Sequence, residues 1–343
     1  MIELRSCNIE DIEKLLIRFG EKNFRAKQIF KWIHRGVENI DEMTDLSKKL
    51  RDMLKNEVYI CNMEIVEKFH SKIDGTMKYL MKLNDGNIIE CVLMKYSFGN
   101  TICISTQAGC SMGCTFCAST IGGKNRDLTP GEMLGQVLKV QRDSNLKVSN
   151  VVLMGTGEPL DNFENVIKFI KLVNHGEGLN IGMRHLTLST CGLVPEIKRL
   201  ADFNMQITLA ISLHAPNDEV RRSIMPIAYK YSFDELLDAC KYYINKTGRR
   251  ITFEYSLISG VNDSDDNAKE LSNKLKGILC HVNLIPVNKV EGKIYSKSNK
   301  ERIEAFRKIL NANGIETTIR RELGSDINAA CGQLRRSYLT NKG

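Results

Sequence analysis

Residues 101–117 read TICISTQAGCSMGCTFC, a short apolar strand that runs into a loop with three cysteines. We expect the strand over Ile102–Thr106, and the cysteines are Cys110, Cys114 and Cys117. Structural zinc is usually held by four ligands in two separated pairs, and no second CxxC pair or HxxxH accompanies this trio. Three closely spaced thiols therefore favour a [4Fe–4S] cluster with one iron left open to a ligand.

From residue 100 onward, short apolar segments alternate with helical segments. We expect strands over Ile102–Thr106, Asn150–Met154, His185–Thr190, Gln206–Leu213, Ile251–Ser256, Cys280–Ile285 and Glu316–Arg320. We expect helices over Pro130–Arg142, Asn162–Val173, Val194–Phe203, Phe233–Lys246, Asp265–Lys276 and Lys300–Asn313. Such alternation predicts an α/β protein with a parallel sheet, and six or seven units predict a barrel or partial barrel. In a barrel, chemistry gathers at the carboxyl ends of the strands.

Other segments precede this barrel. Helical spacing predicts a small helical domain over residues 1–56, whose second and third helices lie near Phe24–Arg35 and Thr44–Lys55. Its basic stripe, from Lys27 through Lys31 to Arg35, is interpreted as a solvated face rather than an RNA contact. The segment 57–95 predicts connecting strands with a hairpin turn at Asp85–Gly86. The predicted domains are thus 1–56, this β-rich connector, a barrel over 96–330 and a C-terminal segment over 331–343.

Composition excludes several classes of protein. The 343 residues are 42% hydrophobic and 26% charged, as in an ordinary globular protein, and no stretch of 18 apolar residues predicts a membrane span. Eleven cysteines are too few for a disulfide scaffold, and no signal segment is visible at residue 1, so we expect a reducing cytoplasmic location. The net charge of +8 suits a nucleic-acid partner without requiring one.

The CxxxCxxC spacing, with Phe116 before the last cysteine, resembles the signature of the radical S-adenosylmethionine (SAM) superfamily. The resemblance implies a partial (β/α)6-type barrel, a [4Fe–4S] cluster on Cys110, Cys114 and Cys117, and SAM bound at the open iron. The segment GTGEPL, residues 155–160, resembles the segment that holds the methionine amino group in these enzymes, through Gly157 and Glu158. Strand ends supply the other implied SAM contacts, which are Ser189, Ser212, Leu213, His214 and Asn288.

Nearly the whole chain resembles the RlmN/Cfr-type RNA adenosine methyltransferases. The discriminating residues are Cys331, in DINAACGQL over 326–334, and Cys103, seven residues before the first cluster cysteine. One departure is Thr156, where the family usually has methionine, and we expect little effect because both flanking glycines are present.

This resemblance implies a radical mechanism that uses two SAM molecules per turnover. One methylates Cys331, and the other yields a 5′-deoxyadenosyl radical that abstracts hydrogen from that methyl group. The resulting methylene radical adds to the adenine, Glu90 accepts the ring proton, and Cys103 attacks Cys331 to leave a transient disulfide. The other six cysteines are interpreted as small core residues, and they are Cys7, Cys61, Cys91, Cys191, Cys240 and Cys280.

The implied substrate is adenosine 2503 of 23S rRNA within the assembling large subunit. Adenosine 37 of some tRNAs is the second implied substrate. Residues 320–325 and 284–288 resemble the C2-methylating branch, whereas C8 methylation of the same rRNA adenosine is the alternative. A non-catalytic iron–sulfur RNA-binding protein and a radical enzyme for a small molecule are hypotheses of other classes. The expected partners also include flavodoxin or ferredoxin as electron donor, and we expect a monomer that binds no membrane.

Basic residues near the predicted site are candidates for contacts to the RNA backbone. They form three pairs, which are Lys124 and Arg126, Arg320 and Arg321, and Arg335 and Arg336. Each pair is equally well interpreted as ordinary surface charge. If the third pair binds phosphate, its neutralisation is expected to weaken RNA binding and flatten the salt dependence.

Overall fold

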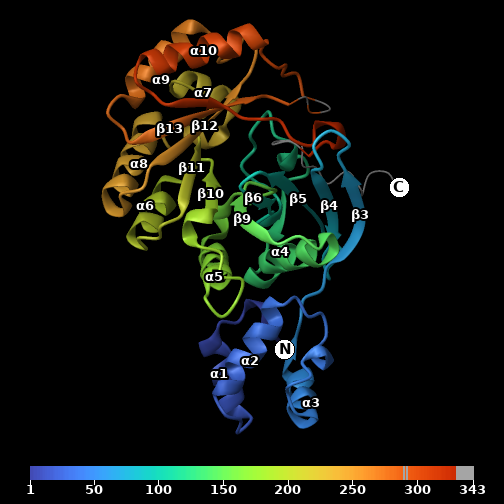
Figure 1. Cartoon of the computed structure of the whole chain (residues 1–343). Helices are drawn as coiled ribbons and strands as arrows, with labels where there is room; N and C mark the ends of the chain where they lie inside the picture. Colours follow the sequence, from blue (N-terminus) through green and yellow to red (C-terminus); the bar gives the residue numbers. More distant parts are fainter. Residues whose placement is uncertain (289, 291–292, 330–343) are drawn as a thin grey trace.

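The computed structural model describes residues 1–288, 290 and 293–329, and it contains one large twisted sheet with helices packed outside it (Figure 1). Ten strands form this sheet in the order β14-β13-β12-β11-β10-β9-β6-β5-β4-β3. The edge strands are β14 and β3, which are not neighbours in this order. The curved sheet is therefore open and forms a partial barrel (Figure 1). The fold predicted from the strand–helix alternation is confirmed.

The parallel part of the sheet is built from alternating strands and helices. Its strands are β6 (Gly99–Cys103), β9 (Val148–Leu153), β10 (Leu186–Thr190), β11 (Thr208–Ser212), β12 (Ile251–Leu257), β13 (Cys280–Pro286) and β14 (Thr317–Ile319). Its helices are α4 (Pro130–Ser144), α5 (Phe163–Asn174), α6 (Val194–Asp202), α7 (Asp218–Ile224), α8 (Phe233–Thr247), α9 (Asp265–Leu275) and α10 (Lys300–Ala312). In this parallel part, all predicted strands and helices are present within a few residues, and α7, of seven residues, is the one helix described here that the sequence does not predict.

Local signals explain the agreement at the helix starts. Thr129, Ser232 and Ser264 each begin a helix with a capping box, in which the side chain accepts from the third backbone N–H of the helix. Proline at the first position of α4 supports the same start. The first predicted strand is displaced, because β6 begins at Gly99 and ends at Cys103.

Three antiparallel strands continue the barrel sheet beyond β6. They are β3 (Glu64–His70), β4 (Met77–Lys82) and β5 (Ile88–Tyr96), and each pairs with its neighbour in the chain. The expected turn between β4 and β5 lies at Gly86, whose φ of +84° favours glycine. The segment 57–95 therefore contributes strands directly to the barrel sheet.

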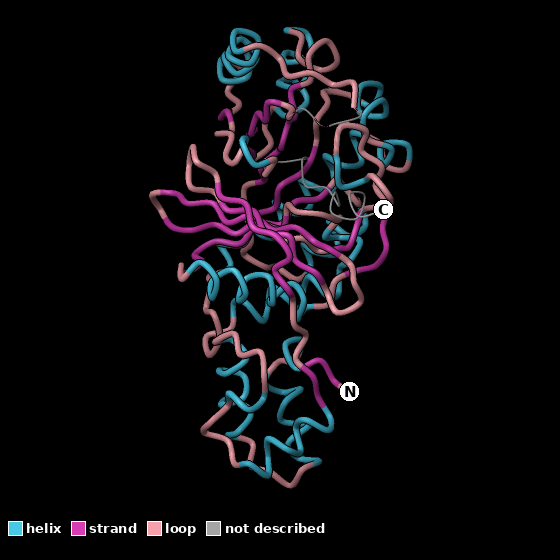
Figure 2. The backbone as a smooth tube through the Cα atoms, turned by 90° about the vertical axis from the view of Figure 1, so that its right-hand side faces the viewer, coloured by secondary structure: helices cyan, strands magenta, loops and turns pink. Residues whose placement is uncertain are grey.

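The N-terminal helices form a separate layer below the sheet in Figures 1 and 2. This layer contains α1 (Ile9–Arg18), α2 (Phe24–His34) and α3 (Lys48–Glu57), and β1 (Ile2–Glu3) pairs with β2 (Val58–Tyr59) to bring its two ends together. Its apolar residues form their own core, which Leu172 of α5 joins. The third helix begins later than predicted, because Ser47 caps it.

A second small ribbon brackets the cysteine loop. Its strands are β7 (Gln107–Gly109) and β8 (Lys124–Asp127), which pair antiparallel across the loop. Their pairing was not predicted, because neither short strand has an alternating pattern. Within residues 1–288, 290 and 293–329, no helix is both long and apolar enough to span a bilayer.

Candidate active site

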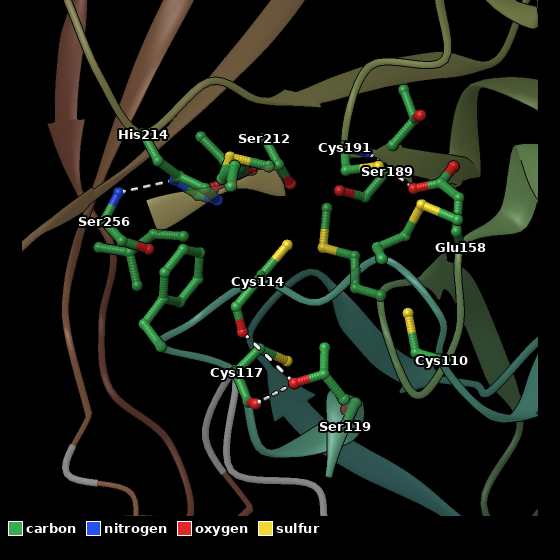
Figure 3. A pocket seen from close by; sticks show the side chains of 18 of the residues that line it. Cys110, Cys114, Cys117, Ser119, Glu158, Ser189, Cys191, Ser212, His214 and Ser256 are labelled. Atoms are coloured by element: carbon green, nitrogen blue, oxygen red, sulfur yellow. Dashed lines mark hydrogen bonds between the residues drawn. The ribbon is translucent and has the colours of Figure 1, made fainter. Parts of the chain in front are cut away.

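A cavity of about 1000 Å³, including its open mouth, lies at the carboxyl ends of the parallel strands. The three cysteines of the loop line one side, and the ends of β10 and β11 line the other with Ser189, Ser212 and His214 (Figure 3). Glu158, Asn288 and Arg320 also line it. Its position is the one expected for chemistry in a strand–helix barrel.

The cysteine loop is held at its start and in its middle. At the start, the Cys110 N–H donates to Gly123 O over 3.2 Å, beside the β7–β8 ribbon. In the middle, the Thr115 N–H donates to Ile224 O at the end of α7 over 2.9 Å. The loop therefore presents its three thiols to the cavity through backbone contacts from elements far apart in the chain.

Burial shapes the chemistry of these thiols. It raises the pKa of Cys110 to about 11 and raises the pKa of Cys114 further. Such thiols keep their protons until a cation replaces them, since metals bind the thiolate. Among the residues described, no three His, Cys, Asp or Glu side chains gather closely enough to hold a single metal ion.

Arg221 of α7 supplies an independent sign that this site suits an anionic group. Its guanidinium is fully buried and donates to Cys191 O over 2.7 Å and to Leu213 O over 3.3 Å. Within the described chain, its Nη1 has no hydrogen-bond partner. A buried cation is costly without an opposite charge, and the thiols that interact electrostatically with Arg221 include those of Cys191 and Cys114. An iron–sulfur cluster on three thiolates fits this donor set and this charge.

The loop after β9 packs tightly against the strand before the cysteines. A Cβ on Gly155 would lie 2.6 Å from Ile104 O, and a Cβ on Gly157 would lie 2.6 Å from the Gln107 Cβ. Gly157 also has a φ of +113°, which favours glycine. These glycines are thus required because the loop packs closely against Ile104 and Gln107. The sequence instead suggests that they allow close contact with a ligand.

Glu158 follows that loop with its carboxylate buried at the cavity wall. It accepts hydrogen bonds from the Cys191 N–H over 2.7 Å and from the Leu160 N–H over 3.0 Å. Burial is the main influence on its pKa, which lies above its usual value. The side chains of Thr190 and Cys191 also hydrogen-bond to this carboxylate, which is therefore an acceptor at the cavity wall.

His214, at the end of β11, is the most constrained residue of the cavity. Its φ of +58° is unusual for a residue with a side chain, and such strain concentrates at functional sites. The Ser256 N–H donates to its Nδ1 over 2.9 Å, and Phe116 packs edge-on against the ring at 5.0 Å. Burial lowers its pKa to about 3, so the ring is neutral and its Nε2–H can donate to a ligand.

Not every predicted contact lies in the cavity lining. The Leu213 side chain is fully buried in the apolar core, its carbonyl accepts from Arg221, and its N–H donates to Glu254 O. Conversely, Cys191 and Ser256 line the cavity although the sequence singles out neither of them, and Cys191 is thus more than the core thiol that its apolar surroundings predict. Both follow or end parallel strands, which is the signal that could have identified them.

A second cavity of about 560 Å³ adjoins the first and shares Met154, Ile285, Asn288 and Arg320 with it. Cys103 lines this second cavity, and Ala329 packs in the same apolar cluster as Cys103. Cys331 lies outside the described residues. The end of the described chain is thus brought to Cys103.

Glu90 lies on the same face of the sheet as Cys103. The register pairs Val92 of β5 with Cys103 of β6, and Glu90 is two residues along the strand from Val92. Its side chain is buried, and Ser105 Oγ donates to its carbonyl over 2.6 Å. The proposed base and one of the two proposed thiols therefore share a surface.

The segment after β14 is tied to the loop between β3 and β4. In Figure 1 it crosses from the barrel to these strands as the red part of the chain. The Gly324 N–H donates to Asp74 Oδ2 over 2.8 Å, the Lys72 N–H donates to Asp326 Oδ2 over 3.0 Å, and Lys78 Nζ donates to Asn328 O over 3.3 Å. We call these six residues the C-terminal clamp.

Three of the four candidate RNA contacts that lie in the described residues are already engaged within the protein. Lys124 lies 2.8 Å from Asp127 and 2.7 Å from Asp161, and Arg126 pairs with Asp85 and Glu132. Arg320 lines both cavities, and its Nη1 lies 4.0 Å from Glu254 Oε2. Arg321 is exposed at the second cavity, whereas Arg335 and Arg336 lie outside the described residues.

The basic stripe on α2 is also partly neutralised, as its interpretation as a solvated face anticipates. Lys27 and Lys31 reach Glu177 at 3.7 Å and 2.9 Å, and the Arg35 guanidinium covers the Trp32 ring at 4.9 Å. Ten cysteines lie in the described residues, and all of them are free thiols.

Comparison with known proteins covers the whole chain. Residues 2–60 match the family described as ribosomal RNA large subunit methyltransferase N-terminal domain, and residues 104–271 match the radical SAM superfamily. A protein of Alkaliphilus oremlandii named a probable dual-specificity RNA methyltransferase RlmN is 60% identical over 340 residues, 99% of each chain. A protein of the same name from Clostridium tetani is 58% identical, over 99% of this chain and 98% of its own.

A solved structure also matches. The crystal structure of a radical SAM methyltransferase from Sphaerobacter thermophilus is 44% identical, with a TM-score of 0.94 over 98% of this chain and 100% of that one. The similarity therefore extends through the helical layer and the barrel together.

Proposed function

This chain belongs to the RlmN family of dual-specificity RNA methyltransferases in the radical SAM superfamily, and from that premise we propose that it methylates C2 of adenosine 2503 in 23S rRNA and of adenosine 37 in some tRNAs. The family implies a [4Fe–4S] cluster and SAM. The observation that carries the proposal is the pair of joined cavities, with three thiols in one and Cys103 in the other.

Cys110, Cys114 and Cys117 would hold the cluster, and the opposite wall would hold SAM. When bound, these groups supply a radical that removes hydrogen from a carbon that no base can deprotonate. Glu158 offers a buried acceptor for the SAM amino group. The close packing of Gly157 positions Glu158. Ser189, Ser212 and Asn288 offer further polar groups, with the backbone of Leu213 behind them. His214 offers the donor described above.

The chain's own residues perform the remaining steps. Cys331 carries the methyl group and becomes joined to the adenine through a sulfur–carbon–C2 linkage. Glu90 takes the C2 proton, and the adduct radical gives up one electron, which would return to the bound cluster, so that the ring regains its aromaticity. The Cys103 thiolate then attacks the Cys331 sulfur, and the sulfur–carbon bond breaks with its electron pair staying on carbon. That carbon gains a proton to become the methyl group, and the two sulfurs are left as a disulfide, which a cellular reductant must open. The presence of Ala329 and Cys103 in one apolar cluster and in the lining of one cavity supports this pairing.

Access requires that the target base leave its stack, since both cavities lie inside the barrel. Unpaired RNA in a loop is the accessible form. We infer that a small electron carrier such as flavodoxin or ferredoxin reduces the cluster, and that the enzyme acts as a cytoplasmic monomer.

Mass spectrometry of nucleosides after anaerobic reaction tests this function. The reconstituted protein is incubated with SAM, a reductant and a 23S rRNA fragment that contains the target adenosine. We expect 2-methyladenosine; 8-methyladenosine would instead indicate the Cfr-like alternative, and no product would contradict both.

The Cys331→Ala variant separates an enzyme from a non-catalytic iron–sulfur RNA-binding protein. Methylation is expected to be lost while iron content and RNA binding are retained. The Cys240→Ala variant is the matched control, because Cys240 is buried in the outer core and should leave methylation unchanged. Full activity in the Cys331→Ala protein would contradict the proposed route.

A further inference from the structure

We propose that Phe98, stacked on Tyr96 at the second cavity, is a platform on which the RNA substrate stacks an unpaired base beside the target adenosine. This inference rests on the proposed function, since it assigns part of the substrate to a surface next to Cys103. It names a contact that lies outside the cluster and SAM cavity.

Tyr96 and Phe98 form an aromatic pair beside the second cavity. The Tyr96 and Phe98 ring centroids are 4.8 Å apart and the rings are inclined by 12°, which is a stacked arrangement. Tyr96 lines the second cavity together with Cys103. Phe98 is 71% exposed although one face is covered by Tyr96, so its other face is open to solvent. An open aromatic face thus continues outward from the cavity that contains a proposed catalytic thiol.

Folding does not require an aromatic ring at this position. Tyr96 pairs with Gly99, so Ser97 and Phe98 form a two-residue turn between β5 and β6. Such turns favour glycine, asparagine or aspartate, because their side chains tolerate the backbone conformation and the solvent. A large exposed ring at a turn is therefore better explained by a ligand than by the hairpin.

Charge around the aromatic pair suits a nucleic acid. Arg321 lines the same cavity and is exposed, and within the described residues no hydrogen bond or ion pair engages it. Lys95, beside Tyr96 in the chain, is also exposed. Unpaired bases are recognised by stacking on aromatic side chains while nearby cations contact phosphates, so this surface combines both requirements. A base flanking the target is the one that reaches it when the target itself enters the cavity.

The test uses reconstituted protein and RNA fragments that carry 2-aminopurine at the position before or after the target adenosine. Stacking quenches this fluorophore, so the wild-type protein is expected to quench one of the two probes. In the Phe98→Ala variant the quenching should be lost and the Kd for RNA should rise by about 5- to 100-fold. The Phe98→Trp variant should retain both properties, and Phe98→Leu, which keeps apolar bulk without a π-face, should behave like alanine.

Controls separate this inference from the proposed function and from misfolding. Phe203 is another partly exposed aromatic residue, at the end of α6 and away from both cavities, so Phe203→Leu should change neither readout. Iron content, SAM binding and RNA-independent methylation of Cys331 should be normal in every Phe98 variant. If wild-type protein methylates RNA but Phe98→Ala binds and quenches normally, the stacking site is wrong. Loss of a dimer in Phe98→Ala would also overturn it, because the ring would then serve a second copy of the chain.

Discussion

At the scale of single residues, the loop that lines the cavity depends on a glycine. Gly157 combines a positive φ with a close approach to Gln107. The Gly157→Ala change is expected to lower the free energy of unfolding by about 1–3 kcal/mol, because it adds backbone strain and a steric clash. Urea denaturation measures this. Gly176→Ala is the control, since a Cβ there would meet no atom within 4 Å, and an equal loss in both variants would contradict the explanation.

The second prediction at the scale of single residues concerns Arg221 and the charge that it places near the cysteine loop. Reduction adds negative charge to a cluster, and a buried cation nearby favours the reduced state. We expect Arg221→Gln to shift the midpoint potential of the reconstituted cluster to more negative values, on the order of tens of millivolts. Arg221→Lys should restore much of the wild-type value.

Spectroelectrochemistry checks the prediction on the Arg221 variants. The adjacent Arg222 has a side chain that is 44% exposed, so its replacement by Gln is a matched control for loss of charge. An unchanged potential in Arg221→Gln would show that this cation does not act on the cluster.

At the scale of secondary-structure elements, the hairpin of β3 and β4 does more than extend the sheet. Through the C-terminal clamp it holds residues 324–328, just before the segment that contains Cys331. We expect Asp74→Ala, which removes the acceptor of the Gly324 N–H, to slow RNA methylation by about tenfold to a hundredfold. SAM binding and iron content should not change, because the clamp does not line the first cavity.

The readout that identifies positioning is the transfer of labelled methyl from SAM to Cys331 without RNA, which should slow together with turnover. Glu64, at the opposite end of β3, has an exposed side chain and provides the control variant Glu64→Ala. Slower turnover with unchanged methylation of Cys331 would place the effect of Asp74 at a later step.

At the scale of the whole molecule, His34 links the helical layer to the barrel. The Leu179 N–H donates to its Nδ1 over 3.3 Å, and its ring packs on Phe30 at 4.2 Å. Burial lowers its pKa to about 3, with His175 adding to the shift, so the folded protein keeps this ring neutral. The unfolded chain binds a proton near pH 6.5, and stability must therefore fall as pH drops from about 6.5 toward 3.

The slope from this group is at most about 1.4 kcal/mol per pH unit, and His214 contributes with the same sign. Denaturation midpoints measured between pH 7 and pH 5 should fall less steeply in His34→Gln than in the wild type. The exposed His70 provides the control His70→Gln, which should retain the wild-type slope. Identical slopes in all three proteins would exclude His34 as a source of acid sensitivity.

Local sequence determined much of this protein. The spacing of Cys110, Cys114 and Cys117, the strand–helix alternation and helix caps such as Ser232 act over fewer than a dozen residues, so each is legible without the rest of the chain. The family resemblance likewise depends on motifs that are contiguous in sequence.

Only the tertiary structure decided what these parts make together. It joined the Cys103 cavity to the cluster cavity, neutralised Lys124 with Asp161, buried Arg221 behind the cysteine loop and gave His214 its strained backbone. These features depend on pairs of residues far apart in the chain, and which distant groups meet is set by strand order and packing. No local pattern encodes that order, whereas a local pattern does encode where each strand and helix begins.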